Sequence, residues 1–110
     1  MREVKVNVLG TEYTLSTAYA AEDPRLANKD GYCDASVKKC VVDEMGDADP
    51  DAKADLGEYR RQVARHELIH AFLFESGLEG CCTWGSEEMV DWLAIQFPKM
   101  AEAFKEAGCL

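Results

Sequence analysis

Five consecutive residues of this chain, His66-Glu67-Leu68-Ile69-His70, have the types and the spacing of a metal site. The apolar residues around them predict a helix, in which residues four apart lie on one face, about 6 Å from each other along the axis. Two imidazoles on consecutive turns can therefore reach one metal ion. Glu67 is expected to point to the side, where it can accept a proton from metal-bound water. The motif thus predicts two metal ligands and a general base.

A three-position motif also occurs by chance, and a lone histidine on a helix is usually an ordinary surface or core residue. Here, however, both histidines of the chain lie in the motif. The flanking residues 68–69 and 71–74 are apolar, which predicts that the helix is buried. Two histidines and a glutamate are costly to bury unless they are paired or bind a metal. These observations favour a metal site over a chance match.

A hydrolytic zinc site usually has three protein ligands and an open position for water, so a third ligand is required. Gly77 is expected to end the motif helix, and Ser86 is a good N-cap for a second helix that packs beside it. Glu87 and Asp91 lie four residues apart on this second helix, and therefore on one face. We expect Glu87 to bind zinc and Asp91 to accept the free ring N–H of a liganding histidine.

Other carboxylates after the motif are weaker candidates for the third ligand. Glu88 is rotated by about 100° from Glu87 around the helix axis. It could replace Glu87 as a ligand only if the second helix were rotated about its axis. Glu75 and Glu79 are expected to be too near the end of the motif helix to fold back easily.

The length and the charge of the chain limit its function. A chain of 110 residues is long enough for a single domain, residues 1–110, with its own core. The net charge of −9 disfavours nucleic acid as a direct ligand. No apolar run approaches the length of a membrane span, and residues 1–5 do not resemble a signal peptide. We therefore expect a cytoplasmic protein with no membrane partner.

Five cysteines are an odd number for a chain that is expected to stay in the cytosol, where thiols are usually reduced. Reduced thiols are therefore the favoured interpretation. A second zinc site is a weaker alternative, because the spacing lacks the C-x2-C pairs of common zinc modules. That site would use Cys33, Cys40, Cys81 and Cys82.

The pattern of apolar and polar residues predicts an α+β fold in which a small, mostly antiparallel N-terminal sheet packs on the motif helix and a C-terminal helix. The strands are expected at residues 4–9, 13–19, 32–35 and 37–42. The motif helix is expected to begin at Asp49-Pro50 or at Asp55. Pro98 is expected to kink or break the second helix. The interior stripe of the motif helix is expected to comprise Leu56, Tyr59, Val63, His66, His70 and Leu73.

The motif, followed by Glu87-Glu88-Met89-Val90-Asp91, resembles the gluzincin metallopeptidases, whose glutamate ligand lies in an E-x-x-x-D arrangement on the following helix. Over nearly its full length the chain also resembles small phage- and prophage-encoded metallopeptidase-like proteins of Gram-positive bacteria. The segments that carry this resemblance are residues 31–34, 66–78 and 87–99.

The resemblance implies a minimal zincin fold without the extra domain that shapes the substrate cleft of large gluzincins. It also implies that residues 37–42 are an edge strand that pairs with an extended substrate, although a plain edge strand protected by lysines is equally compatible. The chain lacks the third histidine of the metzincin pattern. Without a spare histidine, an arginine or a tyrosine would have to stabilise the oxyanion, and nothing in the sequence selects among Tyr13, Tyr19, Tyr32 and Tyr59.

Three functions therefore stay open. The first is a zinc-dependent peptidase that acts on a peptide or protein, with His66, His70 and Glu87 as metal ligands and Glu67 as general base. The second is a binding or regulatory module of phage origin, in which the zinc is structural or the site is catalytically idle. The third is a metal-free α+β protein with an accidental motif.

Overall fold

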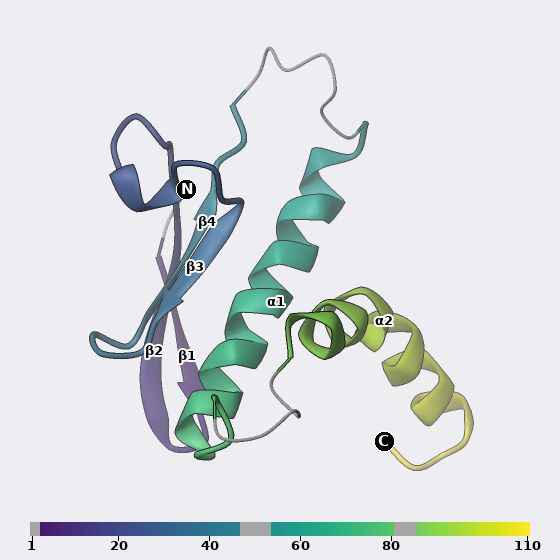
Figure 1. Cartoon of the computed structure of the whole chain (residues 1–110). Helices are drawn as coiled ribbons and strands as arrows, with labels where there is room; N and C mark the ends of the chain where they lie inside the picture. Colours follow the sequence, from purple (N-terminus) through teal and green to yellow (C-terminus); the bar gives the residue numbers. More distant parts are fainter. Residues whose placement is uncertain (1–2, 47–53, 81–85) are drawn as a thin grey trace.

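The computed structural model describes residues 3–46, 54–80 and 86–110, and its elements form three layers (Figure 1). A sheet lies on one side of α1, and α2 lies on the other side. The chain therefore has the α+β architecture that the sequence predicts. The elements of the described part are β1 (Val4–Val8), β2 (Thr11–Ala18), the short 3-10 helix η1 (Pro24–Leu26), β3 (Gly31–Asp34), β4 (Lys39–Asp43), α1 (Leu56–Glu75) and α2 (Glu87–Glu106).

The sheet has the strand order β1-β2-β4-β3. Neighbouring strands β1 and β2 are antiparallel, as are β3 and β4, while β2 and β4 are parallel. The sheet is thus mixed but mostly antiparallel. The expectation that residues 37–42 form an edge strand is wrong, because β4 lies inside the sheet and β3 forms the edge. Cys40, Val41 and Val42 are buried in succession, which is typical of a strand covered on both faces.

The two faces of the sheet are covered by different elements. On the α1 side, Val8, Tyr13 and Cys40 form a core cluster with Ala71 of α1. On the opposite side, η1 supplies Leu26, which packs with Tyr32 and Val41. Because side chains alternate along a strand, β3 therefore directs Tyr32 toward η1, and Gly31 and Cys33 toward α1.

The first helix, α1, begins and ends with sequence-encoded caps. The Asp55 carboxylate accepts a hydrogen bond from Glu58 N at 3.0 Å, which confirms one of the two expected starts. The other, Asp49-Pro50, lies outside the described residues. At the C-terminus, Gly77 has φ +80°, and the backbone N–H groups of Gly77 and Leu78 bond to Phe74 O and Leu73 O. This is a Schellman motif, and it reverses the chain direction.

Val63 and Leu73 of the expected stripe of α1 are buried, but its other four residues are only half-buried. Val63, Glu67 and Ala71, at intervals of four residues, face the sheet and are buried. His66 and His70 instead lie half-buried on the flank of α1 that faces α2. The expected stripe assumed that α1 packs through a single face, whereas α1 is covered on two sides. The residues that face the sheet are therefore shifted by about one position from the expected ones.

The second helix, α2, is continuous through Pro98 and bends along its length (Figure 1), so it is kinked rather than broken. Ser86 caps its first turn by accepting a hydrogen bond from Met89 N at 3.2 Å. Proline has no N–H to donate to the carbonyl four residues earlier, which is that of Ala94. Arg65 Nε of α1 donates to this carbonyl oxygen at 2.7 Å.

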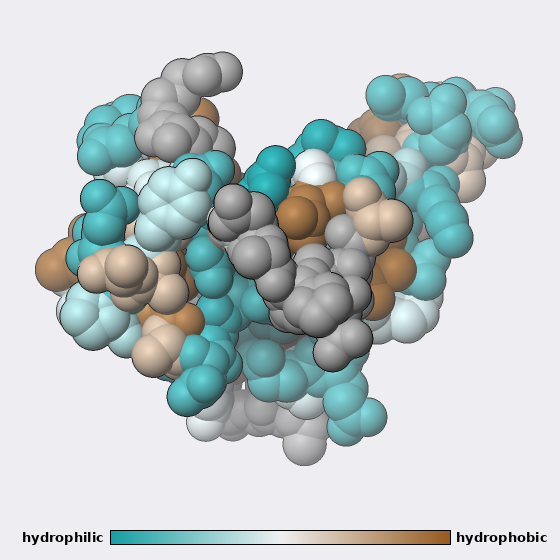
Figure 2. Space-filling view, turned by 90° about the horizontal axis from the view of Figure 1, so that it is seen from above, coloured by the Kyte–Doolittle hydropathy of each residue, from teal (hydrophilic) through white to brown (hydrophobic). Residues whose placement is uncertain are grey.

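Hydrophobic side chains also reach the surface of α2, where Trp92, Phe97 and Phe104 are exposed. The view from above shows hydrophobic residues at the surface and a notch between two lobes of the molecule (Figure 2). Within the described residues, neither helix has an apolar stretch that would suffice to cross a bilayer.

Candidate metal centre

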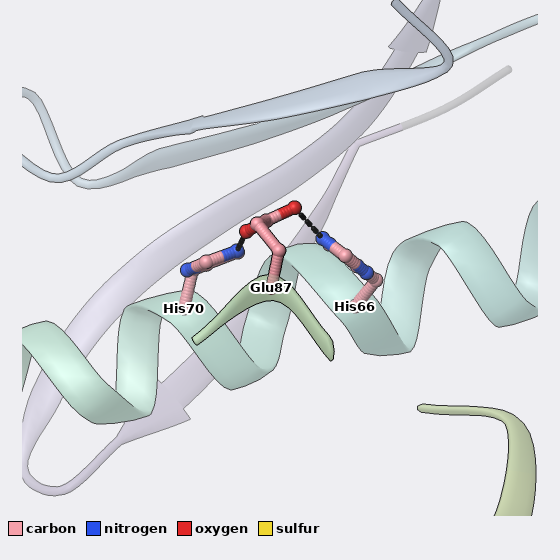
Figure 3. A group of neighbouring side chains, drawn as sticks. All are labelled: His66, His70 and Glu87. Atoms are coloured by element: carbon pink, nitrogen blue, oxygen red, sulfur yellow. Dashed lines mark ion pairs between the residues drawn. The ribbon is translucent and has the colours of Figure 1, made fainter. Parts of the chain in front are cut away.

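The two histidines of α1 hold the carboxylate of Glu87 between them (Figure 3). Their ring centroids lie 5.0 Å apart, as expected for residues on consecutive turns. Glu87 Oε2 lies 3.2 Å from His66 Nε2, and Glu87 Oε1 lies 2.5 Å from His70 Nε2. The first turn of α2 thus brings together the three residues that the sequence predicts as ligands. Glu88, the alternative ligand, is exposed and does not belong to this group.

A second carboxylate holds the outer nitrogen of each ring. Asp91 Oδ1 lies 3.0 Å from His66 Nδ1, so Asp91 occupies the position expected for a partner of a liganding histidine. Glu79 Oε1 lies 2.6 Å from His70 Nδ1. A carboxylate at Nδ1 favours a proton on that nitrogen and leaves Nε2 free to bind a metal. Both rings are therefore oriented with Nε2 toward Glu87.

Glu79 is a site residue that the sequence reasoning missed. It was expected to lie too near the end of α1 to fold back. The Schellman motif at Gly77 makes this possible, because the reversed chain passes back over the last turn of α1. The signal was present in the sequence, since a glycine two residues before an acidic residue can close such a turn.

The donor atoms of this group fit a metal ion. Two imidazole nitrogens and a carboxylate oxygen lie within 4.8 Å of one another, so His66, His70 and Glu87 can hold a cation. In a tetrahedral zinc site with metal–ligand distances of about 2.0–2.2 Å, ligand atoms are about 3.3 Å apart. The 3.2 Å separation between His66 Nε2 and Glu87 Oε2 is close to that value, whereas the 2.5 Å between His70 Nε2 and Glu87 Oε1 is shorter and would have to widen around an ion.

Several carboxylates lie close to the two histidines, and their charges affect the pKa values of the site residues. Burial opposes protonation of His70, but the hydrogen bond to Glu79 and the charges of Glu79, Glu87 and Glu67 outweigh burial and raise its pKa. Burial also raises the pKa of Glu67, while the neighbouring histidines oppose this shift. A carboxyl whose pKa is raised toward neutrality is better suited to take and return a proton.

Glu67 lies at the back of the site, against the edge strand. Its residue is only 8% exposed, and within the described part of the chain no hydrogen bond to its side-chain carboxylate is found. A methyl group built on Gly31 of β3 would lie 2.8 Å from Val63 Cγ1, 2.9 Å from Val41 O and 3.3 Å from Glu67 Cγ. Gly31 therefore permits β3 to approach α1 closely beside Glu67, a role that the sequence reasoning did not assign.

A cleft of about 610 Å³ contains the site. One wall of the cleft is lined by residues 29–33 and Ala35, and a second wall is formed by α1. The rest of the cleft lining comes from Glu79, Glu87 and Asp91. The bond from Asp43 N to Asp30 O makes these two residues a hydrogen-bonded pair. Such pairs alternate along antiparallel strands, so Gly31 and Cys33 direct their backbone N–H and C=O groups away from β4. Among the residues that the structure describes, no strand pairs with this outer edge of β3, which belongs to the cleft wall.

The tyrosines differ in their access to the cleft. The hydroxyl of Tyr13 donates to Glu75, and that of Tyr32 donates to Asp23 on the η1 side of the sheet. Tyr19 does not line the cleft. Tyr59 lines the cleft, and its hydroxyl donates to Asp30. Tyr32 also lines the cleft, but its hydroxyl is bonded to Asp23 on the η1 side, whereas the partner of Tyr59, Asp30, is itself a lining residue.

The expected second zinc site has only two of its residues in the described part. Cys33 and Cys40 are partners across β3 and β4. Cys81 and Cys82 lie outside the described residues.

Comparison of the chain with protein-family models, with curated proteins and with solved structures found no match.

Proposed function

We propose that this protein is a zinc-dependent peptidase. The observation that carries the proposal is the grouping of His66, His70 and Glu87 beside the buried carboxylate of Glu67, in a cleft whose wall is a free strand edge. Two nitrogens and one oxygen are the ligand set of many hydrolytic zinc sites. The resemblance to gluzincins points the same way.

His66, His70 and Glu87 would hold the metal, and Glu79 and Asp91 would keep the two imidazoles in position. When bound, zinc lowers the pKa of a water molecule and polarises a carbonyl group. Glu67 would hold a water molecule at its carboxylate, accept a proton from it and pass that proton to the leaving amine. Burial of Glu67 between α1 and β3 holds its carboxylate in place and raises its pKa, which suits both transfers.

The substrate is an extended peptide that pairs with the free edge of β3. The backbone groups of Gly31 and Cys33 are available for such pairing, and they lie on the same strand that contacts Glu67. Main-chain pairing supplies affinity with little dependence on sequence. β3 replaces residues 37–42 in this role, since β4 is enclosed by β2 and β3.

A second function is a binding module in which the metal is structural. The observation in its favour is that the ligands come from two helices: α1 carries both histidines and α2 carries Glu87. A bound ion would therefore fasten α2 to α1 even without catalysis. In that case the buried Glu67 would have no chemical role.

The test begins with metal content. Protein is stripped of metal with a chelator, supplied with zinc and freed of unbound ion. Elemental analysis is expected to find one zinc ion per chain in the wild type and none in His66→Ala. Hydrolysis is then measured with a library of quenched fluorescent peptides, with and without zinc. Glu67→Gln is expected to retain zinc and to lower hydrolysis by at least 100-fold, because a general base typically contributes 10²–10⁴-fold.

Glu88→Gln is the matched control, since it removes a neighbouring carboxylate outside the group. It is expected to change neither zinc content nor hydrolysis. Stoichiometric zinc without cleavage of any peptide would favour the structural module. Failure to bind any divalent ion would overturn both functions.

A further inference from the structure

Two cysteines face each other on neighbouring strands, one of them lining the cleft and the other buried behind it. Cys33 of β3 and Cys40 of β4 are direct partners in the antiparallel register. Both point toward α1: Cys40 belongs to the core cluster, Cys33 packs against that cluster, and Cys40 Sγ lies 3.6 Å from Glu67 O. The two thiols are therefore neighbours on the same face of the sheet.

The register makes this pair suitable for a disulfide. Asp30 and Asp43 form a hydrogen-bonded pair, so Cys33 and Cys40, three positions along, form a non-hydrogen-bonded pair. In such pairs the Cα atoms are about 4.5 Å apart, which lies within the range of about 4.4–6.8 Å that disulfides span. Both cysteines are free thiols in the structure.

The two thiols differ in access. Cys40 is fully buried, while Cys33 is partly exposed and lines the cleft. A small solute in the cleft can thus reach Cys33 but not Cys40. Hydrogen bonding with Cys40 also lowers the pKa of Cys33, which favours its reactive thiolate form.

We propose that Cys33 and Cys40 form a peroxide-sensitive dithiol that closes to a cross-strand disulfide in the cleft wall. The Cys33 thiolate attacks hydrogen peroxide, which breaks the O–O bond and yields a sulfenic acid and hydroxide. The Cys40 thiol then attacks the Cys33 sulfur and expels water, forming the S–S bond. Overall two thiols are oxidised and one peroxide is reduced to two water molecules. This proposal does not depend on metal binding or on hydrolysis.

Peptide mapping tests the assignment directly. Reduced protein in a chelating buffer is treated with hydrogen peroxide, quenched, alkylated under denaturing conditions and cut with trypsin. Cleavage after lysine and arginine places Cys33 in residues 30–38, Cys40 in 40–53, Cys81 and Cys82 in 66–99, and Cys109 in 106–110. Mass spectrometry is expected to find 30–38 linked to 40–53, with two fewer free thiols per chain, and dithiothreitol is expected to reverse both changes.

Variants separate this pair from other thiols. Cys33→Ser is expected to abolish the linked peptides and to leave Cys40 unmodified, because the peroxide cannot reach Cys40. Cys109→Ser, which removes an exposed thiol, is the matched control and is expected to preserve the link. A link from either peptide to 66–99 or to 106–110, or full alkylation of Cys33 and Cys40 after peroxide treatment, would overturn the proposal.

Discussion

Arg65 on α1 donates from Nε to the carbonyl oxygen of Ala94 on α2, at 2.7 Å. Ala94 is buried, and its carbonyl is the one that Pro98 deprives of a helical partner. A buried carbonyl without a donor is costly, so the arginine compensates for the proline. The same hydrogen bond ties together the two helices that carry the candidate metal ligands.

Arg65→Met is expected to lower the free energy of unfolding by about 1–3 kcal/mol, because it leaves the Ala94 carbonyl unsatisfied. The loss should shrink when Pro98→Ala is also present, since residue 98 then has an N–H for Ala94. Urea denaturation of the four proteins in this double-mutant cycle measures the coupling. Arg61→Met is the control, because Arg61 shares the Glu58 contact of Arg65 but not the contact with α2. Equal losses with and without Pro98 would contradict the compensation.

Glu79→Ala and Asp91→Ala are each expected to weaken zinc binding by about 10–100-fold, because each removes the carboxylate that orients one imidazole. Titration of the metal-free protein with zinc in competition with a chromophoric chelator measures the affinity. Glu88→Ala removes an equal charge from the first turn of α2 without removing a histidine partner, so it should leave the affinity unchanged. If all three variants lost affinity equally, the effect would be one of net charge rather than of ring orientation.

Gly31→Ala is expected to destabilise the fold by about 1–3 kcal/mol, since the new methyl group meets Val63 Cγ1 at 2.8 Å and the Val41 carbonyl at 2.9 Å. Adding Val63→Ala to Gly31→Ala should restore only part of the lost stability, because the contact with the Val41 carbonyl persists. Gly57→Ala provides a control of opposite sign: its methyl group has room in α1, and alanine is a better helix former by up to about 1 kcal/mol. Thermal and urea unfolding compare the variants, and a neutral Gly31→Ala would refute the close approach.

Tyr13→Phe is expected to lower stability at pH 7 and to make stability less dependent on acid pH. The hydrogen bond from Tyr13 lowers the pKa of Glu75, with help from Lys38 and Thr11. A lowered carboxyl pKa stabilises the fold above the ordinary value of 4.5, and this contribution is lost as the pH falls through the lowered value. The difference between wild type and variant should therefore narrow in acid. Tyr19→Phe, at an exposed position, should show no such change.

The sequence predicted much of the fold because its local signals are strong. Helix ends favour a small set of residue types, and the structure has such residues at three helix ends: Asp55, Gly77 and Ser86. The alternation of apolar and polar side chains in residues 4–9 likewise indicated the first strand, which the structure ends one residue earlier, at Val8. The hairpin turn was harder: Leu9 has φ +51° beside Gly10 at +92°, and leucine is rarely expected in that region.

The strand order and the helix rotation could not be predicted, because both depend on contacts between distant residues. The parallel pairing of β2 with β4 places β4 in the interior, and nothing local to residues 37–42 specifies it. The rotation of α1 arises because the sheet and α2 cover it from two sides, and Gly31 leaves the space that Glu67 needs beside the sheet. The group of His66, His70 and Glu87 was predictable despite this rotation, since i, i+4 spacing and the first turn of α2 tolerate a shift of one residue.

The two imidazoles are held at both ring nitrogens by three carboxylates, one from the loop after α1 and two from α2. Their rotameric freedom is therefore lost when the protein folds, and little ordering entropy remains to oppose capture of a cation. Folding also crowds acidic groups together, and a divalent cation relieves their mutual repulsion. Folding and cation capture are thus thermodynamically linked, so the melting temperature should rise with the concentration of the free ion.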